Sequence, residues 1–153
     1  MPRAGPGGTS CDWALDKALR PLEAALTATM MTSAEATQLA DAYLSIWNER
    51  DGNARRARIA STWAPDGLYL DPMLRGEGHD GIDAAIGGAQ PLFPGLNFRR
   101  TSEVDMHNDW LRFTWELGAE GEPPAMAGLD IGQVVDGRLR SIIGFFDIWP
   151  ATE

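Results

Sequence analysis

Two aspartates stand where a carboxyl group could act as an acid or a base. The segment "GLYLDPMLRG" places Asp71 at the end of an expected strand, directly before Pro72. Because aspartate before proline favours a turn, Asp71 is either a turn residue or a carboxylate directed into a cavity. Asp130, in "AGLDIGQ", has only alanine, glycine, leucine and isoleucine beside it. A buried carboxylate there is costly unless it is protonated, whereas on the solvent face of a strand that cost disappears.

A tyrosine is the third candidate for chemistry. Tyr43 shares one helical stripe with Leu39, Ile46 and Trp47. It is therefore either a core aromatic whose hydroxyl finds one partner, or a hydroxyl donor in a site. Neither of the two histidines is expected to be a catalyst, because one precedes a helix and the other ends a hairpin.

Three helices are expected before the sheet that would hold these groups. They run over about residues 33 to 50, 53 to 63 and 81 to 90, with Ser33 as the first N-cap. Apolar residues recur three and four positions apart along the first of them. "RDG" ends the first helix, and Pro91 ends the third.

The second half of the chain changes to a period of two, which indicates strands. After a short strand at 68 to 70, strands are expected at about 96 to 106, 110 to 117, 127 to 135 and 139 to 148. "HND" and "DG" are tight-turn sequences, so the last strands form an antiparallel meander. Helices followed by strands predict an α+β fold with three helices on one face of a curved sheet.

Composition limits the class of protein. With 153 residues, 44% of them hydrophobic and 23% charged, the chain suits a globular domain. A formal charge of -9 would repel a phosphate backbone, so nucleic acid is not an expected partner. Cys11 is the single cysteine and stands far from His79 and His107, so a zinc site is not expected. No apolar run suits a membrane span or secretory signal, which predicts a cytoplasmic protein without a membrane partner.

The start of the chain differs from the rest. Residues 1 to 29 open with "PRAGPGG" and are expected to be an N-terminal extension, flexible or loosely helical over 12 to 29. Residues 30 to 153 are expected to form the domain. Two alternatives remain for these residues. They come from a misassigned start of the chain, or they form a helix that covers a pocket or a partner.

From about residue 34 to 147 the chain resembles the nuclear transport factor two-like superfamily, in its SnoaL-like and ketosteroid-isomerase-like branch. The resemblance is carried by "AYLSIWNERD", "APDGLYLDP", "GHDGIDAAI" and "AGLDIGQVVDGRLRSIIGFFD", in this order and spacing. It implies a cone, also described as a cystatin-like α+β barrel, in which a curved antiparallel sheet wraps around three N-terminal helices. An apolar pocket for a small molecule would open at one end.

The resemblance also implies site residues. Asp71 matches the aspartate that moves the proton, Tyr43 matches the tyrosine of the first helix, and Asp130 matches an aspartate that stays protonated. In that arrangement Asp71 forms an enolate whose oxygen is held by Tyr43 and Asp130. The expected pocket residues are Trp47, Trp63, Phe113 and Phe145.

The expected function is isomerase or polyketide-cyclase chemistry on a small hydrophobic carbonyl compound, with no metal or organic cofactor. A binding module for small ligands, without chemistry, is the alternative, and a purely structural dimer module is a third class. A homodimer is expected because the outer face of the sheet stays free, with Trp110 or Phe146 on it beside polar neighbours.

Overall fold

The chain divides into two compact units, Met1–Met31 and Thr32–Glu153. The computed structural model describes residues 14–15, 17–22 and 31–150. In the first unit, residues 14–15 and 17–22 are helical, and the rest of the helix predicted over 12 to 29 lies outside the described residues, as does Cys11. Everything that follows concerns the second unit.

Three α-helices and one short 3₁₀ helix form the helical part of the second unit: α2 (Ser33–Asn48), α3 (Gly52–Thr62), α4 (Gly78–Ala89) and η1 (Gln90–Leu92). The N-cap of α2 is Thr32, one residue before the predicted cap. It forms a capping box with Glu35, whose backbone N–H donates to Thr32 Oγ1 at 3.2 Å. No helix in the described ranges is long and apolar enough to cross a membrane.

Seven strands form one sheet: β1 (Trp63–Leu70), β2 (Arg75–Glu77), β3 (Asn97–Arg100), β4 (Asp105–His107), β5 (Trp110–Gly118), β6 (Met126–Val135) and β7 (Arg138–Ile148). Their order is β2, β1, β7, β6, β5, β3, with β4 also paired to β5. The meander β5 to β7 is antiparallel, as predicted. The single strand predicted over 96 to 106 is two short strands instead, and β1 pairs with β7 in parallel, which was not predicted.

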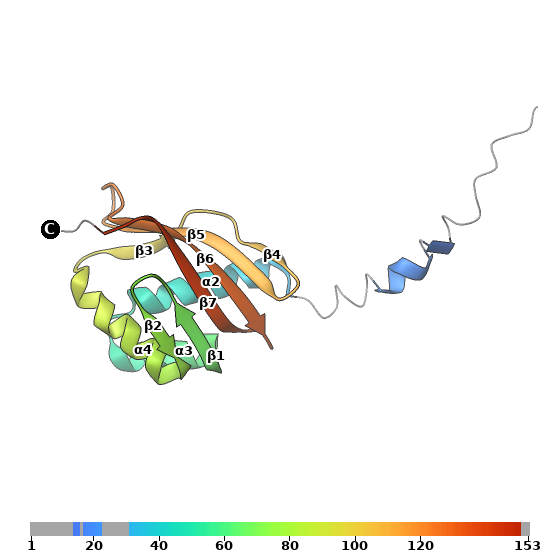
Figure 1. Ribbon diagram of the computed structural model, residues 1–153, viewed down its shortest axis with the longest axis horizontal. Helices are drawn as coiled ribbons and strands as arrows, with labels where there is room; N and C mark the ends of the chain where they lie inside the picture. Colours follow the sequence, from blue (N-terminus) through green and yellow to red (C-terminus); the bar gives the residue numbers. More distant parts are fainter. Residues whose placement is uncertain (1–13, 16, 23–30, 151–153) are drawn as a thin grey trace, which may run out of the picture. The chain divides into compact units, whose positions relative to one another are not determined.

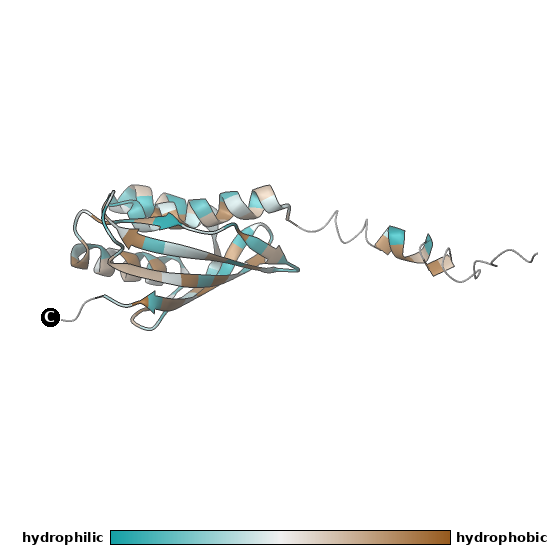
Figure 2. Ribbon diagram, turned by 90° about the horizontal axis from the view of Figure 1, so that it is seen from above, coloured by the Kyte–Doolittle hydropathy of each residue, from teal (hydrophilic) through white to brown (hydrophobic). Residues whose placement is uncertain are grey.

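The sheet is curved and the helices lie on its concave side (Figure 1). Seen from above, the helices cover one face of the sheet and leave the other uncovered (Figure 2). This confirms the predicted α+β class, a curved sheet with three helices from the first part of the chain; the sheet is not closed, and α4 follows β1 and β2.

Alternation along β5 and β6 decides which residues face the helices. Leu111, Phe113, Trp115 and Leu117 are all buried, as their period of two predicted. Asp130 on β6 is buried with them, at 2% exposure. Its carboxyl group therefore lies on the inner face, where an ionised carboxylate is costly.

Candidate active site

The two candidate carboxyl groups lie side by side across a glycine. Strand register places Asp130 opposite Gly144, and Leu70 opposite Ile143, so Asp71 follows next to Gly144 on its other side. A Cβ atom at position 144 would lie 2.9 Å from Asp130 Oδ1 and 3.3 Å from Asp71 Cβ. The missing side chain of Gly144 is therefore what lets the two carboxyl groups share this place.

Gly144→Ala should destabilise the protein by about 1 to 3 kcal/mol, because the new methyl group would push against both aspartates in a buried position. Gly88→Ala is the matched control, since a Cβ there meets nothing within 4 Å and alanine favours the helix α4. Urea unfolding of both variants measures the difference. Equal stability of Gly144→Ala and wild type would contradict the close approach.

Asp130 is held by two donors from the inner face. The Tyr43 hydroxyl donates to Asp130 Oδ2 at 2.8 Å, and Trp115 Nε1 donates to Oδ1 at 2.9 Å. Burial raises the pKa of Asp130 to about 7, although both hydrogen bonds lower it; the charge of Asp71 raises it further. Near neutral pH this group therefore changes between a carboxylic acid and a carboxylate.

The protonation of Asp130 reverses the direction of its hydrogen bond with Tyr43. A carboxylate can only accept, so ionised Asp130 takes the hydrogen of Tyr43. Protonated Asp130 can instead donate from Oδ2 to the Tyr43 oxygen, which frees the Tyr43 hydrogen for another acceptor. Burial, followed by the charge of Asp130, raises the pKa of Tyr43 well above its ordinary value, so Tyr43 keeps its own proton.

Asp71 is both a turn residue and part of a cavity wall. Its Oδ1 accepts from the backbone N–H groups of Met73 and Leu74, each at 2.7 Å, and its Oδ2 accepts from the Tyr69 hydroxyl. A carboxylate has about four lone-pair sites, so one site on Oδ2 remains for a proton. Asp71 is therefore both a turn residue and a carboxylate at a cavity, and the two interpretations that the sequence left open are both correct.

Tyr69 is a site residue that the sequence reasoning missed. It lies on β1 two residues before Asp71, which directly follows the strand, and alternation puts residues two apart on one face. Burial raises the pKa of Tyr69 well above its ordinary value, and the charges of Asp130 and Asp71 add to this effect. Tyr69 is therefore a proton-bearing donor on the cavity wall, and the period of two could have identified it.

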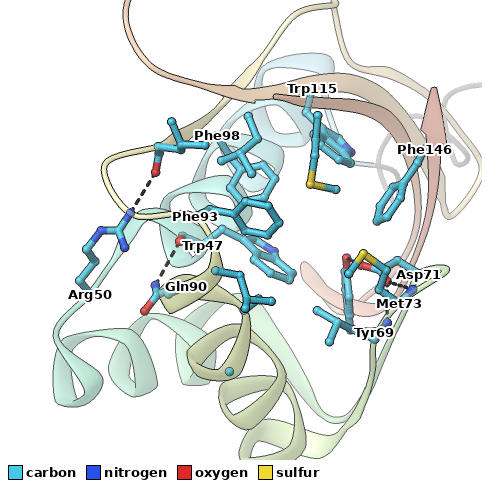
Figure 3. Close-up of a pocket in the computed structure, with 17 residues that line it drawn as sticks. Trp47, Arg50, Tyr69, Asp71, Met73, Gln90, Phe93, Phe98, Trp115 and Phe146 are labelled. Atoms are coloured by element: carbon cyan, nitrogen blue, oxygen red, sulfur yellow. Dashed lines mark hydrogen bonds between the residues drawn. The ribbon is translucent and has the colours of Figure 1, made fainter. Parts of the chain in front are cut away.

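The cavity beside Asp71 is largely apolar and has a volume of about 80 Å³. This is room for several water molecules or part of a small ligand. Its wall comes from the end of α2, β1, the α4 to β3 connection and the strands β5 to β7 (Figure 3). The polar side chains of the wall belong to Arg50, Tyr69, Asp71 and Gln90. Its aromatic side chains belong to Trp47, Phe93, Phe98, Trp115 and Phe146.

The structure brings together some of the predicted site residues. Asp71 and Trp47 line the cavity, whereas Tyr43 and Asp130 are buried next to that wall and are not part of it. Trp63 and Phe113 also do not line the cavity. Their rings pack against the Tyr43 ring, each with a centroid distance of 6.1 Å, and extend the core.

The two phenylalanines of "GFFD" lie on the opposite faces of the sheet from those that the sequence predicts. Phe145 was expected in the pocket, but it lies on the outer face of the sheet with 53% of its surface exposed. Phe146 was expected on the outer face, but it lines the cavity and contacts the Trp115 ring. Alternation shows that two consecutive residues face opposite sides without showing which side is wet.

No group of three metal-binding side chains lies together in the part of the chain that the structure describes. His79 is engaged with the backbone, since its Nε2 lies 2.9 Å from Trp63 O. His107 is exposed beside a turn and contacts Asn108. The ionisable side chains that line the cavity are those of Asp71, Tyr69 and Arg50.

Comparison with known proteins identifies the family. Residues 40–142 match the SnoaL-like domain. A proposed isomerase of the SnoaL-like family from Agrobacterium tumefaciens is 34% identical, with 74% of this chain and 98% of that chain covered at a TM-score of 0.71. No curated protein matches the sequence.

Two more distant structures share the fold. A proposed ketosteroid isomerase from Kribbella flavida is 17% identical, covering 78% of this chain and 83% of its own, with a TM-score of 0.56. A proposed polyketide cyclase from Sinorhizobium meliloti is 14% identical, covering 74% of this chain and 99% of its own, with a TM-score of 0.58. The chain belongs to the SnoaL-like family of the nuclear transport factor two-like superfamily.

Proposed function

We propose that the protein is a cofactor-free acid/base enzyme that forms an enolate from a small hydrophobic carbonyl compound, as an isomerase or a cyclase. The observation that carries this proposal is the pair of aspartates across Gly144, one on the cavity wall and one buried with a pKa of about 7. A carrier of small ligands needs no buried carboxyl group beside a carboxylate. The 34% identical relative, itself a proposed isomerase, supports the same class.

In the proposed reaction, Asp71 Oδ2 removes a proton from the carbon next to a carbonyl group. The Tyr69 hydroxyl, which donates to Asp71 in the free protein, turns to the enolate oxygen as negative charge develops there. The proton held by Asp71 then returns at another carbon in an isomerisation. In a cyclisation the enolate carbon attacks a second carbonyl, and the proton passes from Asp71 to the alkoxide oxygen that forms there. A positioned base supplies about 10² to 10⁴ in rate, and an oxyanion donor a comparable factor.

Tyr43 and Asp130, which are buried next to the cavity wall, support Tyr69 as the hydrogen-bond donor. In the structure the Tyr43 hydroxyl donates to Asp130, and the nearby Tyr43 also lowers the pKa of Tyr69 against the larger effect of burial. Tyr43 has one hydrogen, so it donates to Tyr69 only when it does not donate to Asp130. Protonated Asp130 thus completes a line of donors, from Asp130 through Tyr43 and Tyr69 to the enolate oxygen.

The test of the proposal is proton exchange from deuterated water into a panel of small cyclic and acyclic β-diketones and enones, followed by mass spectrometry. We expect exchange at least about 10²-fold faster than in buffer for the compounds that fit the cavity. If compounds bind but none of the panel exchanges faster than in buffer, the enzyme interpretation is wrong and the protein is a ligand-binding module.

We also propose that the protein is a homodimer that pairs through the outer face of its sheet. Leu129 lies beside Phe145 there, and Ile131 beside Ile143, which makes a continuous apolar outer patch. Sedimentation should give twice the chain mass of 16.6 kDa at micromolar concentration. Phe145→Glu should shift the protein to monomers, and a wild-type monomer under the same conditions would contradict this proposal.

A further inference from the structure

Most arginines of the second unit form an ion pair with a carboxylate, but Arg50 forms none with the described residues. Of the ten arginines between residues 31 and 150, eight make an ion pair with a carboxylate, at N to O distances of up to 3.8 Å. Arg50 and Arg138 have no such partner among the described residues. Only Arg50 of these two lines the cavity.

The Arg50 guanidinium is held at the wall and still has donors to offer. Its Nη2 donates to Leu96 O at 2.9 Å, which uses one of its five N–H groups. The neighbouring acids do not neutralise it. Glu49 Oε2 lies 3.1 Å from Arg58 Nη2, and Asp51 caps α3. Arg50 is therefore an exposed cation without a carboxylate partner among the described residues that also lines a mostly apolar cavity, in a chain of net charge -9.

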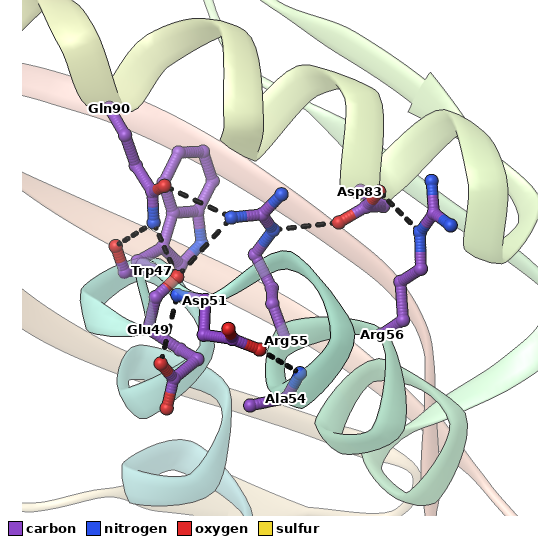
Figure 4. A network of polar contacts seen from close by, with 8 residues as sticks. All are labelled: Trp47, Glu49, Asp51, Ala54, Arg55, Arg56, Asp83 and Gln90. Carbon is purple, nitrogen blue, oxygen red and sulfur yellow. Dashed lines mark hydrogen bonds and ion pairs between the residues drawn. The ribbon is translucent and has the colours of Figure 1, made fainter.

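The other polar group on this side of the cavity, the Gln90 amide, already uses both of its N–H donors (Figure 4). Its Nε2 donates to Trp47 O at 3.1 Å and to Glu49 O at 2.7 Å, while its Oε1 accepts from Arg55 Nη1 at 3.0 Å. Arg55 is in turn fixed by Asp83, at 2.7 Å from Nε to Oδ1. Gln90 is therefore fixed as part of the wall by Arg55, which does not line the cavity, and Arg50 is left as the side chain on this side with N–H donors to offer a ligand.

Arg50 and Asp71 occupy different sides of the cavity. Figure 3 shows Arg50 on one side, Asp71 and Met73 on the other, and the rings of Trp47 and Phe98 between them. A ligand that presents the carbon next to its carbonyl group to Asp71 would cross these apolar rings and place its remote end near Arg50.

We propose that the ligand carries a carboxylate at that remote end, so that the natural substrate class is hydrophobic oxo acids rather than neutral ketones. The placement of the carbonyl end rests on the proposed function. A guanidinium binds a carboxylate through two parallel hydrogen bonds, and an apolar wall strengthens this attraction relative to open water. Lysine would supply the charge without the planar pair of donors.

The experiment compares equilibrium binding of 4-oxo-4-phenylbutanoate and its methyl ester, followed by tryptophan fluorescence at pH 7. Wild type should bind the acid about 10- to 100-fold more tightly than the ester. Arg50→Gln should remove this preference and leave ester binding within about twofold. Arg50→Lys should keep part of it, and a thermal melt of each variant checks folding. Arg138→Gln is the matched control, because Arg138 is exposed and without a carboxylate partner among the described residues like Arg50 but does not line the cavity, and it should keep the full preference.

Equal binding of acid and ester by wild type, binding of neither probe, or an undiminished preference in Arg50→Gln would each overturn the assignment of Arg50. Turnover is not needed for this measurement. Asp71→Asn should keep the preference for the acid, and an acid preference in a wild-type protein without proton exchange would leave Arg50 assigned while the enolate chemistry fails.

Discussion

Asp71→Asn should slow proton exchange into a bound ketone by about 10²- to 10⁴-fold and leave the melting temperature within about 3 °C of wild type. The asparagine Oδ1 can still accept from the Met73 and Leu74 N–H groups, so the turn is retained. Its Nδ2 replaces the oxygen that accepts from Tyr69, and that hydroxyl can rotate to accept instead. What the variant loses is the one free lone-pair site able to take a proton.

Asp147→Asn is the control for this prediction, because Asp147 is an exposed carboxylate near the end of β7 and should leave both exchange and stability unchanged. If Asp71 is only a turn residue, Asp71→Asn would behave in the same way as this control. Exchange that continues undiminished in Asp71→Asn would therefore mean that another group is the base.

Asp130→Asn should change how stability depends on pH. The pKa of Asp130 is about 7 in the folded protein and about 3.9 for an aspartate in an unfolded chain. Because the folded pKa is the higher one, its stabilising contribution is complete below about pH 4 and is lost as the pH rises to about 7. Three pKa units correspond to a change on the order of 4 kcal/mol.

Asparagine does not titrate, and the other carboxyl groups are common to both proteins. The difference in unfolding free energy between wild type and Asp130→Asn, measured in urea from pH 4.5 to 8, should therefore move against wild type as the pH rises. A difference that stays flat over this range would contradict a raised pKa for Asp130.

The same variant should change the pH profile of exchange. Wild-type exchange is expected to fall as the pH rises through about 7, because ionised Asp130 takes the Tyr43 hydrogen away from Tyr69. Asparagine at this position, with its Nδ2 donating to Tyr43 and its Oδ1 accepting from Trp115, imitates the protonated acid. Asp130→Asn should accordingly keep its rate above pH 7, where wild type loses it.

The sequence predicted the fold from local patterns. The helical stripe of α2 and the alternation in β5 are each visible within a dozen residues, and "DG" marks the turn between β6 and β7. The parallel pairing of β1 with β7 joins segments about seventy residues apart, and no local pattern encodes it. That pairing is what brings Asp71 to Gly144 and so to Asp130.

The sequence points to Asp71, Tyr43 and Asp130 through the resemblance more than through the residues themselves, and their roles stay a prediction. The structure joins two of them, since Tyr43 and Asp130 are hydrogen-bonded to each other. Trp115 as a second donor to Asp130 could not be predicted, because it depends on the register between β5 and β6. Gly144 was missed for a related reason, since its role is the absence of a side chain between two neighbours from other strands.

The protonation state of Asp130 tests the account most directly, because it separates an acid/base site from a simple binding pocket. Carbon-13 NMR of the aspartate carboxyl groups, with the Asp130 signal identified by its loss in Asp130→Asn, follows this titration in the folded protein. We predict a carboxyl signal that titrates near pH 7. A signal for Asp130 that titrates near pH 4, as an exposed aspartate does, would contradict the account.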